Sequence, residues 1–227
     1  MLIVIEGLDG SGKSTQVARL REYLEQRCGS VDYIHFPRYD APVYGPLIGK
    51  FLRGGFGSID EVHPQIVALL FADDRHGASE GIRETLSGGG TVLLDRYVYS
   101  NVAYQCAKLS DPEEKEALMR WIIDTEFGDF GIPKPDLNIF LDVPIDFVRD
   151  RLSASREGGD REYLEGESDI HEADILFQQK VRSIYSALAA GDNSFRRIDC
   201  SSASGRMLPP DVIFQKVKEV VDQYLVD

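Results

Sequence analysis

Gly7-Leu-Asp-Gly-Ser-Gly-Lys-Ser14 comes just after the apolar run Met1–Ile5, with only Glu6 between them, and this stretch decides the fold of the chain. It fits the pattern of a glycine, four residues and then glycine, lysine and serine, which is typical of a phosphate-binding loop between a strand and a helix. The alternative is an ordinary glycine-rich turn before a helix. Because the strand, the spacing, the lysine and the serine occur together, we predict a phosphate-binding loop.

The residue types of this loop suit phosphate. Glycines let the backbone curl until several N–H groups point at one phosphate, an approach that a Cβ atom would hinder. The helix expected after the loop adds its positive N-terminal end. Lys13 can then reach the outer phosphates of a nucleotide, and the Ser14 hydroxyl can bind Mg²⁺.

The composition predicts a compact enzyme with an acidic surface. The chain has 227 residues, with 25 Lys and Arg against 38 Asp and Glu, which gives a net charge of −13. That balance disfavours bulk binding to nucleic acid or to an anionic membrane, so an anionic ligand needs a local basic pocket. The apolar N-terminal run is too short for a membrane span and lacks the basic start of a signal peptide, so we expect neither.

The cysteines and histidines have no metal-binding spacing. The cysteines are odd in number and widely scattered, which suggests reduced thiols and a cytoplasmic protein. They are Cys28, Cys106 and Cys200. We interpret the four histidines as structural or surface residues: His35, His63, His76 and His171.

Short apolar runs alternate with helical patterns along the chain. The expected strands are 2–6, 31–36, 91–95, 137–142 and 195–199, and each is apolar over most of its length, as in a parallel sheet buried on both faces. The helical patterns lie near 13–27, 62–86, 98–124, 145–154, 170–190 and 210–225. This alternation predicts a three-layer α/β P-loop NTPase fold with a mostly parallel five-stranded sheet. We expect one domain, 1–227, that binds ligands beyond the carboxyl ends of the strands.

A charged pair ends the third expected strand. Asp95 there is well placed to hold Mg²⁺, directly or through water, and Arg96 offers a planar fork that suits a phosphate. An Asp–Arg ion pair that merely caps the strand is the alternative. The neighbouring phosphate loop favours the functional interpretation.

A second candidate pair lies on the long helix expected at 62–86. Phe71 and Arg75 are four residues apart and therefore project from the same face. An aromatic ring and a guanidinium could stack on a planar base and hydrogen-bond to its edge. From the spacing alone, a core role for Phe71 is favoured, because most Phe residues at helical spacing belong to the core.

The segment of about 150–168 is rich in arginine, glycine and glutamate and poor in apolar residues. Such a segment is typical of a mobile surface loop. In a phosphoryl-transfer enzyme it can also close over the phosphates as a lid, neutralise charge and exclude water. The next residues, Asp169-Ile-His-Glu172, have the spacing of a capping box at the start of a helix.

The ordered set of motifs resembles that of the thymidylate kinases, a family of P-loop nucleoside-monophosphate kinases. A phosphate loop alone is shared by many classes of protein, whereas this set is specific and runs from residue 2 to about 165. The motifs are Glu6-Gly-Leu-Asp-Gly-Ser-Gly-Lys-Ser-Thr15, Phe36-Pro37, Leu70-Phe-Ala-Asp-Asp-Arg75, Asp95-Arg-Tyr97, the segment 100–105, Pro133-Lys-Pro-Asp-Leu-Asn-Ile-Phe-Leu-Asp-Val143 and the arginine-bearing segment.

The resemblance implies an activity and partners. It implies transfer of the γ-phosphoryl group of ATP to dTMP, which gives dTDP and ADP, with Mg²⁺ as the metal ion. It also implies a homodimer whose substrates are small molecules. A kinase of another deoxynucleotide or of a deoxynucleoside is the alternative, and a P-loop ATPase switch is a more distant one. The sequence lacks the Asn-Lys-x-Asp motif that reads guanine.

The resemblance also assigns roles to residues of this chain. The residues implied for ATP binding are Gly7, Gly10, Ser11, Gly12, Lys13, Ser14 and Thr15. Those implied for dTMP binding are Asp9, Arg38, Phe71, Arg75, Arg96, Ser100, Asn101, Tyr104 and Gln105. Those implied for the metal ion are Ser14 and Asp95. Within these sets, Asp9 matches a contact to the sugar 3′-hydroxyl, Phe71 a thymine-stacking ring, and Tyr104 a ring under C2′ that disfavours ribonucleotides.

Two arginine assignments depend on the branch of the family. Gly10 stands where one branch has an arginine in the loop, so the catalytic arginine of this chain is expected in the lid. The catalytic set is then Lys13, Arg96, Arg156 and Arg161, with Arg151 behind them. A further arginine for the acceptor phosphate is expected after Phe36-Pro37; Arg38 is the first candidate and Arg53 the reserve.

Overall fold

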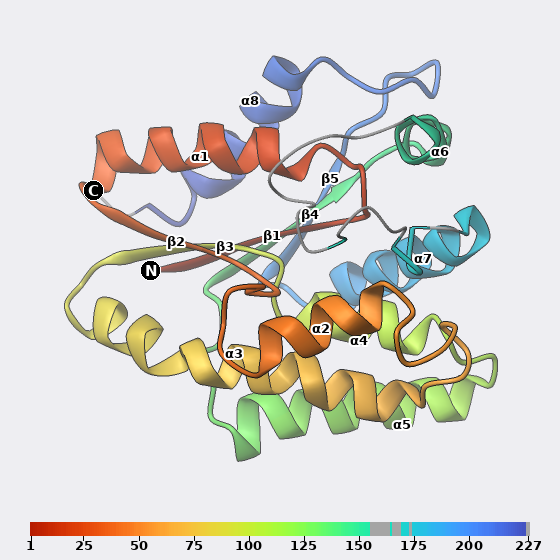
Figure 1. Cartoon of the computed structure of the whole chain (residues 1–227). Helices are drawn as coiled ribbons and strands as arrows, with labels where there is room; N and C mark the ends of the chain where they lie inside the picture. The colour runs from red at the N-terminus through yellow and green to blue at the C-terminus, as the bar shows by residue number, and fades with distance from the viewer. Residues whose placement is uncertain (155–163, 165–168, 173, 226–227) are drawn as a thin grey trace.

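Five parallel strands form one sheet at the centre of the molecule (Figure 1). They are β1 (Leu2–Gly7), β2 (Val31–His35), β3 (Thr91–Asp95), β4 (Leu137–Asp142) and β5 (Phe195–Asp199). Their order in the sheet is β2-β3-β1-β4-β5. This computed structural model describes residues 1–154, 164, 169–172 and 174–225. The predicted strands are confirmed to within one residue, and every strand pairing is parallel.

Helices cover both faces of the sheet. They are α1 (Lys13–Cys28), α2 (Tyr44–Leu52), α3 (Pro64–Ser87), α4 (Val98–Cys106), α5 (Pro112–Ile123), the π-helical turn η1 (Asp124–Asp129), α6 (Ile145–Ser153), α7 (Ile175–Gly191) and α8 (Pro210–Val221). In Figure 1, α1 and α8 lie on one side of the sheet and α2 to α5 on the other. The predicted three-layer α/β fold is therefore confirmed.

The side chains of β1 alternate between two apolar cores, one on each face of the sheet. Ile3 and Ile5 pack into the core that includes α1 and α8, whereas Leu2 and Val4 pack into the core with α3, α4 and α5. All four are fully buried. Burial of a side chain of this size stabilises the fold by about 1.5–3 kcal/mol. The central strand thereby fixes where its carboxyl end, and the loop after it, must lie.

The helical pattern expected over 98–124 is two helices. After α4 the chain turns, and Asp111 begins α5, since its Oδ1 accepts hydrogen bonds from the amides of Glu113 and Glu114 at 2.8 and 3.0 Å. Pro112 at the first helical position fits this N-cap. The break places α4 under the end of β1 as a short, buried helix.

Helix α2 was not predicted. Its sequence holds Gly45, Pro46 and Gly49, which are weak helix formers. A cluster of buried apolar side chains, including Ile48 and Phe51, packs it against α3. A Cβ atom at Gly45 would lie 2.2 Å from the carbonyl oxygen of Tyr39, so glycine allows the preceding loop to lie directly on α2.

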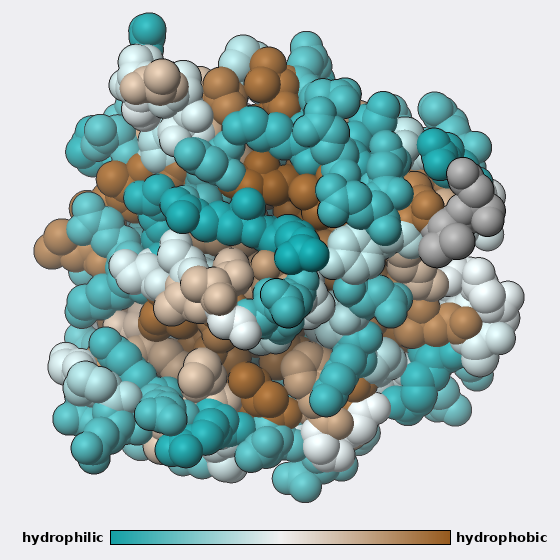
Figure 2. All heavy atoms as spheres, turned by 180° about the vertical axis from the view of Figure 1, so that it is seen from behind, coloured by the Kyte–Doolittle hydropathy of each residue, from teal (hydrophilic) through white to brown (hydrophobic). Residues whose placement is uncertain are grey.

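The surface is largely polar. Hydrophilic residues dominate the face shown in Figure 2, with smaller apolar areas between them. This agrees with the net charge of −13. None of the helices in the described ranges is both long and apolar enough to cross a membrane.

Candidate active site

The loop between β1 and α1 has the backbone of an anion-binding site. Gly10 and Gly12 adopt left-handed conformations, with φ of 69° and 82°, which favour glycine. Gly12 is the N-cap of α1 and, as a glycine, has no side chain that could cap this helix end. Its first N–H groups are therefore available for an anion, as the sequence predicted.

Side chains close the floor of this loop. A Cβ atom at Gly7 would lie 3.0 Å from Ser11 Oγ and 3.2 Å from Lys13 Cγ, so a larger residue here would have to displace these side chains. Lys13 Nζ donates to the carbonyl oxygen of Leu8 at 3.1 Å. Burial and the charge of Arg96 lower the pKa of Lys13 to about 8. A bound phosphate would return this pKa toward its usual value.

Asp95 ends β3 beside the loop and has a free oxygen. Its side chain is buried, Oδ1 has no hydrogen-bond partner among the described residues, and Oδ2 lies 3.4 Å from His35 Nδ1. Burial raises the pKa of Asp95, but the hydrogen bond with His35 and the charge of Lys13 outweigh this and lower it. A charged carboxylate with a free oxygen, together with the exposed Ser14 hydroxyl, provides the hard oxygen ligands that Mg²⁺ prefers.

The donor set around Asp95 is small. Among the residues that the structure describes, no three His, Cys, Asp or Glu side chains converge as a metal site. Mg²⁺ is commonly held by one or two carboxylates together with substrate phosphates and water. The residues present therefore fit an ion that arrives with a nucleotide.

Arg96 lies opposite the loop and is held by three side chains. Its Nη2 lies 2.6 Å from Asp9 Oδ1, its Nη1 donates to Ser100 Oγ at 3.2 Å, and the Tyr104 hydroxyl donates to Asp9 Oδ2 at 2.7 Å. Burial raises the pKa of Asp9, but the charges of Arg96 and Lys13 outweigh it and lower this pKa to about 2. Both members of the pair are therefore charged at neutral pH.

The backbone of Arg96 is unusual. Its φ is +69°, a left-handed conformation that a side chain rarely adopts. Glu6, fully buried at the end of β1, accepts hydrogen bonds from the amides of Tyr97 at 3.0 Å and Ser100 at 3.2 Å. These bonds fix the start of α4 and hold Arg96 in its strained conformation.

Glu6 also receives two hydroxyl groups. Ser100 Oγ donates to Oε2 at 2.5 Å, and the Tyr185 hydroxyl of α7 donates to the same atom at 2.9 Å. Burial raises the pKa of Glu6 despite these bonds. Glu6 begins the loop motif, but no role was predicted for it. A second signal is its charge inside the apolar pattern of a central strand.

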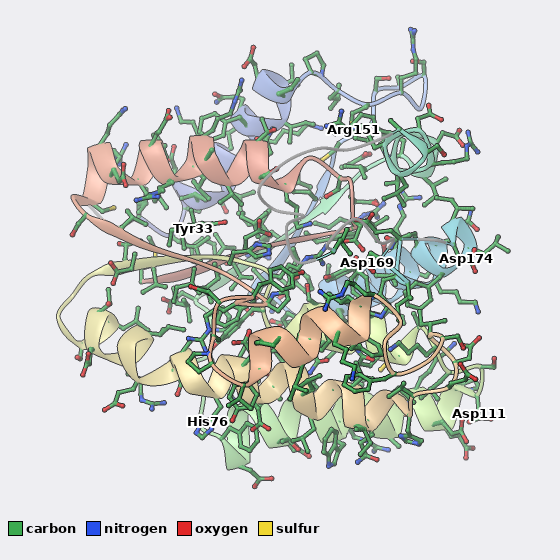
Figure 3. The ribbon with its side chains drawn as sticks, viewed as in Figure 1. Tyr33, His76, Asp111, Arg151, Asp169 and Asp174 are labelled. Carbon is green, nitrogen blue, oxygen red and sulfur yellow. The ribbon has the colours of Figure 1, made fainter. Side chains whose placement is uncertain are left out.

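A cavity, named here the Tyr104 cavity, extends from Arg96 between α2, α3 and α4. Its lining residues are Asp9, Phe36, Pro37, Tyr39, Leu52, Phe71, Arg75, Arg96, Ser100, Asn101, Tyr104, Gln105, Asp169 and His171. The sequence-derived substrate residues are thus brought together here, with the exception of Arg38. Figure 3 labels Asp169, which lies between α2 and the start of α7.

The far end of the Tyr104 cavity holds a fixed pattern of polar atoms. Arg75 pairs with the buried Glu126 of η1 through two contacts of 2.5 and 2.7 Å. Asn101 Nδ2 donates to Glu126 Oε1 at 2.8 Å and to the carbonyl oxygen of Ala68 at 2.9 Å. Asn101 Oδ1 is buried and has no partner among the described residues.

Phe71 has a core contact and also a place in the cavity lining, so its stacking role stays a prediction. It packs against the cluster that includes Phe51, with ring centroids 6.5 Å apart, and it also lines the Tyr104 cavity. It is therefore a half-buried ring with one side available to a ligand.

Arg38 is engaged elsewhere. Its Nε lies 2.9 Å from Asp74 Oδ1, and its Nη2 donates to the Asp74 carbonyl oxygen at 2.6 Å. It is not among the lining residues of the Tyr104 cavity. Arg53 is the C-cap of α2 and does not line that cavity either. A phosphate-binding role for Arg38 or Arg53 stays a prediction.

A second cavity, named here the Phe147 cavity, lies on the other side of the loop. Its lining residues are Ser11, Gly12, Thr15, Gln16, Leu141, Phe147, Arg151, Cys200, Met207, Leu208, Pro209, Pro210 and Ile213. Arg151, in the last turn of α6, is labelled in Figure 3. The predicted lid arginines Arg156 and Arg161 lie outside the described residues.

The capping-box prediction was wrong. Helix α7 begins at Ile175 with Asp174 as its N-cap, whose Oδ1 accepts from the amide of Leu176 at 2.8 Å. Asp169 instead holds a turn, because its Oδ1 accepts from the amide of His171 at 2.7 Å. The turn places His171 in the lining of the Tyr104 cavity. The sequence had predicted a structural or surface role for this histidine.

Comparisons with known proteins agree with this geometry. A family model described as thymidylate kinase matches residues 5–206. A thymidylate kinase of Mycobacterium tuberculosis is 34% identical over 93% of this chain and 99% of its own length. A probable thymidylate kinase of Thermococcus kodakarensis is 37% identical over 83% and 84%. The solved structure of thymidylate kinase from Candida albicans has a TM-score of 0.71 at 27% identity, over 100% of this chain and 95% of that one.

Proposed function

The chain belongs to the thymidylate kinase family, and we propose that its Tyr104 cavity binds dTMP for transfer of the γ-phosphoryl group of ATP. The enzyme is a phosphotransferase that gives dTDP and ADP, with ATP as donor and Mg²⁺ as the metal ion. One observation carries the placement of dTMP: a single cavity runs from a fixed base-sized polar pattern at Arg75 to the guanidinium of Arg96 beside the phosphate loop.

The polar pattern matches the edge of thymine. The carboxylate of Glu126 fixes the guanidinium of Arg75, which can donate a hydrogen bond to the acceptor O4 of thymine. Asn101 Nδ2 is used by two acceptors, which leaves Oδ1 as an acceptor for the N3–H of thymine. Cytosine presents the opposite donor and acceptor pattern on this edge and leaves both groups unsatisfied. The ring of Phe71 supplies a stacking surface.

Charge neutralisation drives the transfer in this proposal. The bond from Pγ to the bridging oxygen of ADP breaks, and a bond forms from Pγ to a phosphate oxygen of dTMP. That oxygen is already anionic, so the reaction needs no strong general base. Lys13 and the loop amides hold the outer phosphates of ATP, and Arg96 aligns the acceptor phosphate. Mg²⁺, held by Ser14 and Asp95, supplies further charge neutralisation when bound.

The remaining proposed roles concern the donor nucleotide and the lid. The Phe147 cavity on the far side of the loop suits the rest of the donor nucleotide, with Thr15 and Arg151 at its wall. The catalytic role of Arg156 and Arg161 in a lid, at about 150–168, stays part of the proposal. We treat 1–227 as one domain.

An acceptor screen tests the function and its specificity together. ADP release is measured with dTMP, dUMP, dCMP, dGMP, thymidine or no acceptor. We expect dTMP to give the largest rate, and dCMP to be at least ~100-fold less efficient because two buried polar groups lose their partners. Equal rates with several acceptors would indicate a broader deoxynucleotide kinase. Steady hydrolysis that no acceptor stimulates would indicate a P-loop ATPase.

We also propose a cytoplasmic homodimer. Apolar side chains on the neighbouring helices α2 and α3 are exposed: Leu47 at 39%, Ile66 at 63% and Leu69 at 36%. A second copy of the chain could cover them. Sedimentation equilibrium of the intact enzyme at micromolar concentration measures the mass, and a monomer throughout would contradict the dimer.

A further inference from the structure

His171 has a place in the Tyr104 cavity that the proposed reaction does not use. It lies in the turn before α7, and 5% of its surface is exposed. Its ring nitrogen Nε2 is buried and has no hydrogen-bond partner among the described residues. Buried polar groups in folded proteins nearly always have a partner, so this atom marks a place where a ligand is expected.

Three aromatic rings hold the imidazole in place. Phe177 stacks on it, with centroids 5.5 Å apart and planes at 26°. Tyr104 lies 5.3 Å away at 44°, and Phe51 lies 5.6 Å away at 67°. A ring packed on three sides cannot turn its free nitrogen toward another protein group without disturbing these contacts.

The backbone of His171 is tied to Asp9. Gln178 Nε2 donates to the His171 carbonyl oxygen at 2.9 Å and to Asp9 Oδ2 at 3.1 Å. Asp9 in turn pairs with Arg96 at the phosphate end of the cavity. These bonds tie the turn of His171 to the Asp9–Arg96 pair at the phosphate end. His171 also lines the cavity that extends to Arg75, so it can contact the sugar of a nucleotide that spans the two ends.

The charge around the ring favours the neutral imidazole. Burial lowers the pKa of His171 well below its ordinary value, and the charges of Lys108 and Arg96 lower it further, against the opposing charge of Asp9. A neutral imidazole has one N–H and one lone pair. It suits a hydroxyl group, which both donates and accepts, better than it suits a phosphate.

We propose that His171 Nε2 hydrogen-bonds to the 3′-hydroxyl of the acceptor nucleotide, and that His171 is a specificity-determining residue for 3′-hydroxylated substrates. This inference rests on the proposed binding of dTMP in the Tyr104 cavity. Asp9, which Gln178 links to His171, would face the same hydroxyl. Two groups, one from the loop after β1 and one from the turn before α7, then contact one hydroxyl from two sides.

Binding and turnover of dTMP and of its 3′-deoxy analogue test the inference. His171→Phe keeps an aromatic ring among the three rings that surround His171 but removes both ring nitrogens. His171→Gln keeps a polar side chain that can still form a hydrogen bond. For His171→Phe we expect dTMP to bind about tenfold more weakly, the effect of one lost hydrogen bond, while the analogue binds within about twofold of the wild type. His171→Gln should recover part of the loss.

His76→Phe is the matched control, because this histidine lies on the outer face of α3 and stacks on Phe130, away from both cavities (Figure 3). Equal weakening for dTMP and the analogue, or no weakening for either, would overturn the role of His171. Thermal melting shows whether each variant is folded. If the wild type binds dTMP in calorimetry but transfers no phosphate, the proposed function fails while the test of His171 stands.

Discussion

The phosphate loop and the Tyr104 cavity are two halves of one site, but they are built differently. The loop is one contiguous segment whose proposed function resides in its glycine conformations and in the first backbone amides of α1. The cavity joins side chains from distant parts of the chain through ion pairs, the buried pair of Arg75 with Glu126 and the partly buried pair of Arg96 with Asp9. The loop is therefore specified locally, whereas the cavity exists only in the assembled fold.

This difference has a consequence for mutations. A change of Lys13 in the loop removes one group from one ligand and leaves these ion pairs in place. A change in the cavity leaves a buried partner without its counter-charge, so substrate binding and stability fall together. Loop variants should therefore lose activity with little loss of stability. Cavity variants should lose activity and stability together.

The largest effect is expected in the cavity, for Glu126→Gln. The side chains of Arg75 and Glu126 are 3% and 1% exposed. Loss of the carboxylate charge leaves the buried Arg75 without a counter-charge. We therefore expect a loss of about 3 kcal/mol in the free energy of unfolding and a raised KM for dTMP. Urea unfolding and initial-rate kinetics measure both.

Glu116→Gln is the control for this comparison. Glu116 pairs with Arg120 at 3.6 Å on the surface, with side chains 61% and 66% exposed. It should change the stability by less than about 0.5 kcal/mol. A Glu126→Gln enzyme as stable as this control would contradict the coupling of stability and binding in the cavity.

The next effect is expected in the loop, for Lys13→Met. We expect turnover at saturating ATP and dTMP to fall by at least ~100-fold, since one preorganised charge contact is lost. Lys180→Met, at an exposed position of α7, is the control. Near-normal turnover of Lys13→Met, measured as dTMP-dependent ADP release, would remove Lys13 from the catalytic set.

The smallest effect is the pH dependence of the same variant. The pKa of Lys13 is about 8 in the fold against an ordinary value of 10.5, so between these values the unfolded chain binds more protons. Its burial penalty is fully present below pH 8 and is lost as the pH rises to 10.5. The free energy of unfolding of the wild type should therefore rise, relative to that of Lys13→Met, by about 2 kcal/mol over this window. Parallel urea titrations at both ends measure it, and a constant difference between the two proteins would contradict it.

The sequence predicted what depends on local pattern. The strands and the phosphate loop are local, and the motif residues of α3 and α4 met in one cavity because the carboxyl ends of parallel strands share one edge of the sheet. Helix α2 escaped prediction because packing of Ile48 and Phe51, and not helix propensity, stabilises it. Asp169 looked like a helix cap because Glu172 follows at the right spacing, but the helix begins only at Ile175.

The missed residues are buried polar groups with distant partners. Glu126 is matched to Arg75, 51 residues away, and Gln178 to Asp9, 169 residues away. No periodicity encodes such pairs, since each residue is polar within a helical segment and reads as solvent-facing. Burial and hydrogen-bond partners, which only the fold supplies, identify them.

The hydrogen bonds of Glu6 bear on how the molecule folds. Its partners Tyr97 and Tyr185 lie 91 and 179 residues further along the chain. A carboxylate at the end of the central strand is costly to bury before those partners arrive. Contacts of such large sequence separation form slowly, because the intervening chain must first be ordered. We therefore expect the strained conformation of Arg96 to form late in folding, so that the site becomes competent only when β1, α4 and α7 have come together.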